Sequence, residues 1–213
     1  MTSEPGLRER KRQRMYQTIS DTAIGMFLAD GFDQVSVAEV AAAAEISKPT
    51  LFRYFPTKED LVLHRFADHQ DEAARVVRER PADQSPLDAL HRNFTAGLDR
   101  DDPVTGLCDD PGVLAFHGLL HSTPSLVARL WEYTDRAEEA LAGTLRDLLP
   151  QTPQADITAR LAAGQILVAQ RVLALDNWRR IAGGSTAADA RPGALAAADH
   201  AFGQLRTGLA DFR

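Results

Sequence analysis

Residues 36–61 read SVAEVAAAAEISKPTLFRYFPTKEDL, and this stretch decides the fold. Ser36 precedes Glu39 by three positions, the spacing of a capping box in which each side chain bonds the other's backbone amide, so a short helix should begin here. After a brief break, Ser47 can cap a second short helix. Pro49 fits the first turn of that helix, because a missing amide donor costs little there.

A longer helix precedes this pair and another follows it. Apolar residues at helical spacing predict a first helix over residues 7–30, which ends where Gly31 can take a left-handed conformation. The second short helix should cover residues 48–54, since Pro56 cannot continue it and Thr57 can cap the next helix. This succession is typical of a helix-turn-helix, which lays its last helix into the major groove of DNA.

The same stretch resembles the DNA-binding signature of the TetR family of transcriptional regulators, and the resemblance covers residues 12–63. It implies that Lys48, Pro49 and Phe52 face the edges of DNA bases. It also implies that a second group of residues contacts backbone phosphates, namely Ser36, Thr50, Arg53, Tyr54 and Lys58.

The chemistry of these side chains agrees with that division. Lys48 can donate to guanine acceptors, while Pro49 and Phe52 can contact thymine methyl groups. The predicted recognition helix carries few long polar groups, so we expect DNA sequence to be read partly through apolar contacts and DNA shape. The alternative for Phe52 is a place at the edge of the core, and for Arg53 a solvated position.

Charge is distributed unevenly along the chain. The net charge of −6 argues against a protein that coats nucleic acid over its whole surface. Residues 1–20 nevertheless hold five basic and two acidic side chains, and residues 66–213 hold the whole acidic excess. We expect the basic residues to form an N-terminal arm on DNA phosphates, the alternative being a solvated helix end. They are Arg8, Arg10, Lys11, Arg12 and Arg14.

The rest of the chain continues with helical patterns and shows no alternating strand pattern. The pattern predicts a connector helix over residues 58–80, then helices over residues 87–98, 113–121, 124–149, 153–182 and 191–211. The fold class is therefore all-α, with about nine helices. We expect a helix-turn-helix domain over residues 1–56 and a helical ligand-binding and dimerisation domain over residues 57–213.

A homodimer is predicted from the last two helices. The helix over residues 153–182 is apolar on more than one face, so one face needs a partner. The last helix offers a stripe suited to packing against a symmetry mate, made of Leu195, Phe202, Leu205 and Leu209. The family resemblance implies a four-helix dimer interface there, and two recognition helices roughly 34–36 Å apart on a palindromic operator.

Candidates for a ligand pocket come from the middle of the second domain. They are Phe94, Leu98, Leu114, His117, Leu120, Trp131, Gln165 and Arg171. Arg171 is the strongest of them, because an arginine in so apolar a segment needs a carboxylate or phosphate partner, which an internal acid could also supply. The apolar candidates have plain core packing as their alternative. The layout of residues 125–178 also resembles that of regulators that respond to acyl-coenzyme A or other amphipathic metabolites.

Several other classes of protein are disfavoured. One cysteine, Cys108, excludes an internal disulfide, and the charged N-terminus and the absence of a long apolar segment predict a cytoplasmic protein that neither crosses nor contacts a membrane. His117 and His121 have a spacing that can bind zinc, but no third ligand is evident, so we expect no metal and no cofactor. An enzyme is disfavoured because no nucleophile with an attendant base can be assembled.

The sequence thus predicts a sequence-specific DNA-binding transcriptional regulator. We expect a repressor that a small-molecule effector of unknown identity releases from its operator; activation of transcription is the alternative. Two further hypotheses stay open at this point: a helical metal hydrolase that uses His117 and His121, and a scaffold or ligand-binding protein whose head has lost DNA binding.

Overall fold

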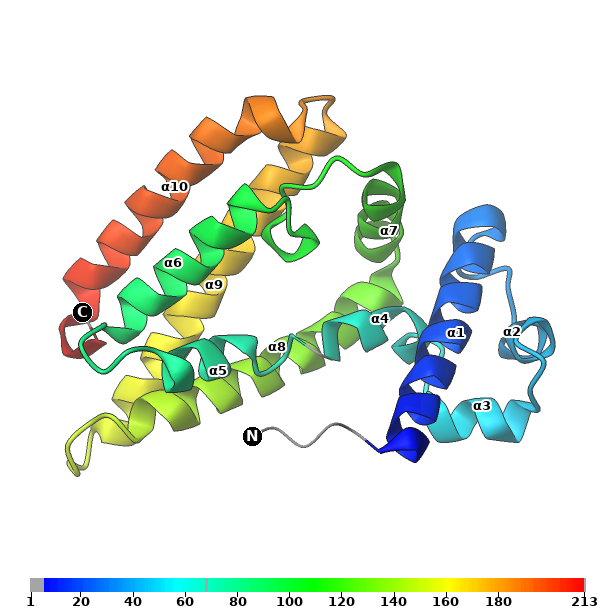
Figure 1. Cartoon of the computed structure of the whole chain (residues 1–213), viewed down its shortest axis with the longest axis horizontal. Coiled ribbons are helices and arrows are strands. Elements are labelled where there is room, and N and C mark those ends of the chain that lie inside the picture. Colours follow the sequence, from blue (N-terminus) through cyan, green and yellow to red (C-terminus); the bar gives the residue numbers. More distant parts are fainter. Residues whose placement is uncertain (1–5, 68, 213) are drawn as a thin grey trace. The chain divides into compact units, whose positions relative to one another are not determined.

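A computed structural model describes residues 6–67 and 69–212 of the chain (Figure 1). The described residues form ten α-helices and two 3-10 helices, and no strand among them, so the all-α fold class is confirmed. The α-helices are α1 (Leu7–Asp30), α2 (Val37–Ala43), α3 (Lys48–Tyr54), α4 (Asp60–Ala67), α5 (Glu72–Glu79), α6 (Pro86–Asp99), α7 (Pro111–Ser122), α8 (Pro124–Arg146), α9 (Ala155–Ala182) and α10 (Ala187–Gly208). The 3-10 helices are η1 (Pro103–Thr105) and η2 (Ala210–Phe212).

The turn between α2 and α3 is a tight helix C-cap. The amide of Ile46 donates to the carbonyl of Ala41 at 2.9 Å, and the amide of Glu45 donates to the carbonyl of Ala42 at 3.1 Å. This is the paired bonding of a Schellman motif. Glu45 takes the left-handed conformation with φ 55°, a position usually held by glycine. The predicted break between the two helices is therefore correct, although no glycine marks it.

The single connector helix predicted over residues 58–80 is wrong. The structure has two helices there, α4 and α5, and residues 69–71 lie in a turn before α5. The amide of Glu72 donates to the carbonyl of His69 at 3.2 Å, and the His69 ring bonds the Glu72 carboxylate at 2.7 Å. The backbone bond from Glu72 to His69 closes a turn immediately before α5. The apolar pattern is interrupted there by five polar residues, 68–72, and the prediction of one helix bridged this gap from Phe66 to Ala73.

The chain divides into two compact units. The described residues of unit 1 lie within Met1–Ala67 and Gly118–Leu130, and those of unit 2 within Asp68–His117 and Trp131–Arg213. In unit 1, α4 packs on α1, and the hydroxyl of Ser20 donates to the carbonyl of Leu61 at 2.7 Å. Leu61, Val62 and Leu63 of α4 are fully buried. Helix α4 thus packs with the helix-turn-helix in unit 1. The division of function at residue 56 stays a prediction.

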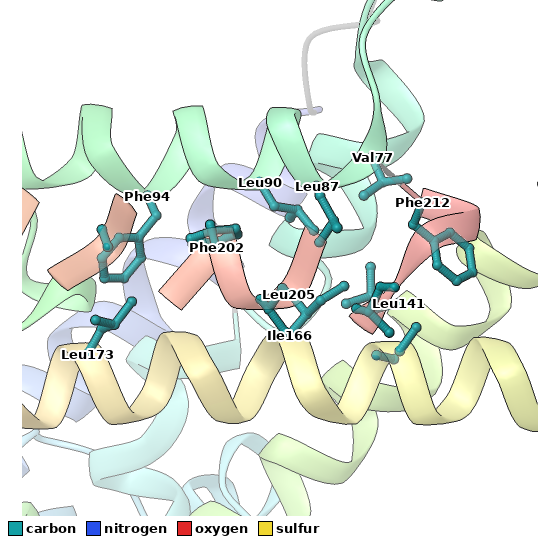
Figure 2. Close-up of a cluster of buried hydrophobic side chains, with 14 of the residues drawn as sticks. Val77, Leu87, Leu90, Phe94, Leu141, Ile166, Leu173, Phe202, Leu205 and Phe212 are labelled. Atoms are coloured by element: carbon teal, nitrogen blue, oxygen red, sulfur yellow. The ribbon is translucent and has the colours of Figure 1, made fainter. Parts of the chain in front are cut away.

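The core of unit 2 is built by α6, α9 and α10, which lie alongside one another (Figure 1). Figure 2 shows Phe94 of α6 and Leu173 of α9 pointing into the space between their helices, where Phe202 of α10 joins them. Leu205 and Ile166 continue the same cluster. Burial of such side chains is the main favourable contribution to folding.

Helix α10 differs from its prediction in two respects. It begins at Ala187 rather than near residue 191, because Thr186 caps it and Pro192 lies inside the helix. The predicted dimer stripe also turns inward: Phe202, Leu205 and Leu209 are buried within their own subunit. The pattern showed an apolar face correctly but could not show whether that face meets α6 and α9 or a second copy.

Candidate nucleic-acid interface

The first helix of the predicted motif is held by its own sequence. The hydroxyl of Ser36 accepts from the amide of Glu39 at 3.2 Å, and the Glu39 carboxylate accepts from the amide of Ser36 at 2.7 Å. The predicted capping box is therefore present. The Ser36 amide, and then its hydroxyl, hold the pKa of the Glu39 carboxyl below its usual range. A hydroxyl engaged in this way can still accept or donate once more, so Ser36 stays a predicted phosphate contact.

Helix α3 separates a buried face from an exposed one. The hydroxyl of Ser47 accepts from the amide of Thr50 at 3.2 Å, and it lies 2.8 Å from the Thr50 hydroxyl. Leu51 is fully buried, whereas Phe52 is 41% exposed. The ammonium of Lys48 lies 5.8 Å from the centre of the Phe52 ring. An exposed aromatic ring with a cation beside it offers both an apolar and a donor surface to a ligand.

Lys58 is already engaged inside the head. Its ammonium donates to the carbonyl of Phe32, and it lies 4.4 Å from the centre of the Phe32 ring and 5.4 Å from that of Phe27. A phosphate would have to share this ammonium with the turn that follows α1. The predicted phosphate contact of Lys58 therefore has a structural role as its alternative, which sequence reasoning did not consider.

Sequence reasoning also missed an aromatic cluster behind α3. Tyr16 of α1 stacks on His64 of α4, with ring centres 4.7 Å apart. Its ring also meets Tyr54 at 4.8 Å and Phe55 at 5.3 Å, edge to face. The end of α3 is thereby fixed to both α1 and α4. Tyr16 precedes the quoted stretch by twenty residues, so only the tertiary structure brings it here.

A buried ion pair joins the first residue of α4 to α8. Asp60, the first residue of α4, is 5% exposed, and its carboxylate accepts from Arg129 of α8 at 3.0 Å and 3.3 Å. The same carboxylate accepts from the amide of Thr57 at 3.1 Å, while the Thr57 hydroxyl accepts from the amide of Asp60 at 3.2 Å. Burial would raise the pKa of the Asp60 carboxyl, but the hydrogen bonds from Arg129 and Thr57 outweigh it and hold the pKa below its usual range.

The predicted basic arm lies on α1. Its five residues are all exposed on the first two turns of this helix: Arg8, Arg10, Lys11, Arg12 and Arg14. Their contact with phosphates remains a prediction, for the helical surface that the sequence also predicted.

The predicted ligand candidates are distributed over the two compact units. Phe94 and Leu98 are buried in the core of unit 2, Leu114 is partly buried against it, and Leu120 is buried in unit 1. Gln165 is exposed.

Two ligand candidates, Trp131 and Arg171, do come together, while His117 meets an aromatic residue that was not a candidate. His117 of α7 stacks with Trp178 of α9, with ring centres 6.4 Å apart. The guanidinium of Arg171 lies 5.3 Å from the centre of the Trp131 ring, which is 52% exposed. Arg171 is exposed, so the burial that made an acidic partner necessary is absent. Its role in ligand binding stays a prediction.

Unit 2 has a polar hollow of about 580 Å³ on its surface. It is lined by Pro81, Asp83, Gln84, Asp88, His91, Arg92, Thr95 and Arg206, none of which was a predicted ligand residue. Arg206 donates to Asp88 at 2.8 Å and bonds His91 at 3.1 Å, so these charges are satisfied within the protein.

No three His, Cys, Asp or Glu side chains within the described residues come together to hold a metal ion. Among the helices of the described part of the chain, none is long and apolar enough to cross a membrane.

Comparison with known proteins supports what the geometry indicates. Residues 19–64 match the family model described as bacterial regulatory proteins, tetR family. The chain is 31% identical over 156 residues to the transcriptional repressor LfrR of Mycolicibacterium smegmatis, an alignment that covers 72% of this chain and 75% of LfrR. The chain belongs to the TetR family. It is also 34% identical over 137 residues to the regulator TcmR of Streptomyces glaucescens, where the match covers 63% of this chain and 59% of TcmR.

Two solved structures share the fold. Salmonella enterica GusR is 20% identical to this chain, with a TM-score of 0.53 and coverage of 98% of this chain and 97% of GusR. NalD of Pseudomonas aeruginosa, described as the secondary repressor of the MexAB-OprM multidrug efflux pump, is 14% identical with a TM-score of 0.55, covering 90% of this chain and 96% of NalD. At these identities the likeness concerns the fold alone.

Proposed function

We propose that this TetR-family chain is a homodimeric transcriptional repressor that binds a palindromic operator and is released by a small-molecule effector. The observation that carries the proposal is the exposed face of α3, where Lys48, Pro49 and Phe52 are all exposed while Leu51 is fully buried. A short capped helix with such a face suits the major groove, in which lysine can donate to guanine and apolar groups can meet thymine methyls.

The relatives named above are regulators of transcription, so the proposed activity is DNA binding without catalysis, in the cytoplasm. The proposed phosphate contacts of the helix-turn-helix are Ser36, Thr50, Arg53, Tyr54 and Lys58, together with the basic residues of α1.

Arg171 and Trp131 are the proposed effector contacts best supported by geometry, because together they offer a flat apolar ring and a guanidinium. An amphipathic organic anion would suit such a pair.

The test begins with an operator recovered from random-sequence DNA by repeated binding to the wild-type protein. Its affinity is then measured by fluorescence anisotropy for the wild type, for Lys48→Ala and for Arg160→Ala, whose exposed arginine lies on α9. Lys48→Ala should lose about 1–3 kcal/mol of binding free energy. Arg160→Ala should bind like the wild type. Failure of the wild type to retain any DNA at low salt would end the proposal.

Lysine labelling gives an independent view of the same face. The chain has three lysines, Lys11, Lys48 and Lys58, so acetylation can be followed at each by mass spectrometry. In the free protein Lys58 should react more slowly than Lys48, because its ammonium is held by the carbonyl of Phe32. Operator DNA should protect Lys48. Equal reactivity of Lys48 with and without DNA would contradict its proposed base contact.

A further inference from the structure

The Asp60–Arg129 ion pair differs from the surface ion pairs of the chain. The side chains of Arg129 and Asp60 are only 22% and 7% exposed, and the guanidinium meets both carboxylate oxygens. In unit 1 the pair of Arg65 and Asp21 is 54% and 62% exposed, which makes it weak and adjustable. A bidentate ion pair that is shielded from water holds one geometry, and removal of either partner is costly.

On the side of Asp60, the pair is tied to the recognition helix through short connections. Asp60 bonds Thr57 in both directions, and the neighbouring Lys58 is fixed to the carbonyl of Phe32 at the end of α1. Five residues separate Asp60 from Tyr54, the last residue of α3, and buried Phe55 lies among them. A displacement of Asp60 therefore displaces the segment that ends α3.

On the side of Arg129, the pair is tied to a helix that runs through both compact units. Helix α8 is one helix of 23 residues, and it passes from unit 1 to unit 2 after Leu130. Trp131 is the first residue beyond that point. The guanidinium of Arg171 on α9 lies over its ring. Residues of one continuous helix move together, so a shift of α8 in unit 2 reaches Arg129 without crossing a loop.

We propose that the Asp60–Arg129 pair couples α8 to the recognition helix, α3. DNA binding by the helix-turn-helix then alters the surroundings of Trp131. Conversely, a change at Trp131 alters DNA affinity. Such coupling is reciprocal by thermodynamic necessity. The inference rests on the proposed function of operator binding. Both residues act by positioning α3 rather than by contacting DNA.

The experiment uses tryptophan emission and needs no effector. The chain has two tryptophans, so Trp178→Phe leaves Trp131 as the single emitter, and its 52% exposure makes it sensitive to acrylamide quenching. The operator recovered above is added to saturation, as checked by anisotropy. In the Trp178→Phe protein, DNA should change the quenching of Trp131. In Trp178→Phe/Arg129→Gln it should leave the quenching unchanged, although DNA is bound, and the operator should bind at least about fivefold more weakly.

Two further variants keep the result interpretable. Asp60→Asn breaks the same pair from the head, far along the chain from the emitter, and should abolish the DNA-dependent change as Arg129→Gln does. Arg136→Gln alters an exposed arginine seven residues further along α8 and should leave the change intact. The inference is overturned if DNA binding leaves Trp131 unaffected in the parent protein, or if the effect persists in both pair variants. A wild type that binds no DNA would instead refute the proposed function.

Discussion

At the scale of single residues, the structure shows which side chains are tied to the protein itself. Lys58, placed on DNA phosphate by the family resemblance, is bound to a carbonyl and two rings of its own head. Arg171, expected to need an acidic partner, lies exposed over Trp131. A residue's type predicts which groups it can bond, while its neighbours decide which of them it meets.

Gly106 is a position where no side chain fits. Its φ is +74°, and a Cβ atom there would lie 1.9 Å from the carbonyl oxygen of Ala174 on α9. Gly106→Ala should therefore destabilise the protein by several kcal/mol, within the range of roughly 1–5 kcal/mol for strain and overpacking. Urea unfolding measures the loss. The matched control is Gly203→Ala on α10, where a Cβ meets nothing within 4 Å and a gain of about 0.5–1 kcal/mol is expected.

Because of Asp60, the free energy of unfolding should fall in acid. Because its folded pKa lies below the ordinary value of about 3.9, the stabilisation is complete above that value and is lost as pH falls through the lower folded pKa. Urea unfolding at a series of pH values should thus show a steeper loss below pH ~4 in the wild type than in Asp60→Asn. Asp21→Asn, which removes an exposed ion pair, should keep the wild-type profile. Identical profiles for all three proteins would refute the role of Asp60.

At the scale of elements, the helix-turn-helix is specified by its caps. Ser36 and Ser47 bond the amides of Glu39 and Thr50 as their sequence spacing predicts. These bonds span three residues, so no tertiary contact is needed to form them. Helices α4 and α5 show the limit of such reasoning, since the prediction of one helix joined Phe66 to Ala73 across the polar residues 68–72, where the structure has a turn.

The cap of α3 should matter for DNA binding as well as for stability. Ser47→Ala removes the acceptor for the Thr50 amide and should cost about 1 kcal/mol in unfolding free energy while weakening operator affinity. Ser85→Ala is the matched control, because Ser85 caps α6 by accepting from the amide of Asp88, and both helices have a proline in their first turn. It should cost similar stability and leave DNA affinity unchanged. Loss of affinity in both variants would show a global effect.

At the scale of the whole molecule, α9 rather than α10 shows an unpartnered apolar face. Helix α9 exposes Ile157, Leu161, Val168 and Val172, whereas the stripe of α10 packs inside the subunit. Exposed apolar residues in a row along one helix mark an interaction surface. The dimer proposed for this regulator would therefore rest mainly on α9.

Val168→Glu tests that surface. A buried carboxylate in an apolar interface is costly, so the variant should be monomeric by light scattering at concentrations where the wild type is a dimer. Val104→Glu makes the same substitution at a valine that is 44% exposed, compared with 50% for Val168, and lies in η1. It should leave the dimer intact. A dimeric Val168→Glu protein would place the interface elsewhere.

The sequence by itself determined the features that depend on neighbours a few residues away: the helical class, the caps at Ser36 and Ser47, the break before α3 and the family. Only the tertiary structure decided what depends on distant segments. Arg129 meets Asp60 across 69 positions of sequence, and Gly106 meets Ala174 across 68. The burial of the apolar stripe of α10 within its own subunit likewise depends on distant segments. Periodicity shows that a face is apolar, but the partner that covers it is chosen by the packing of the whole chain.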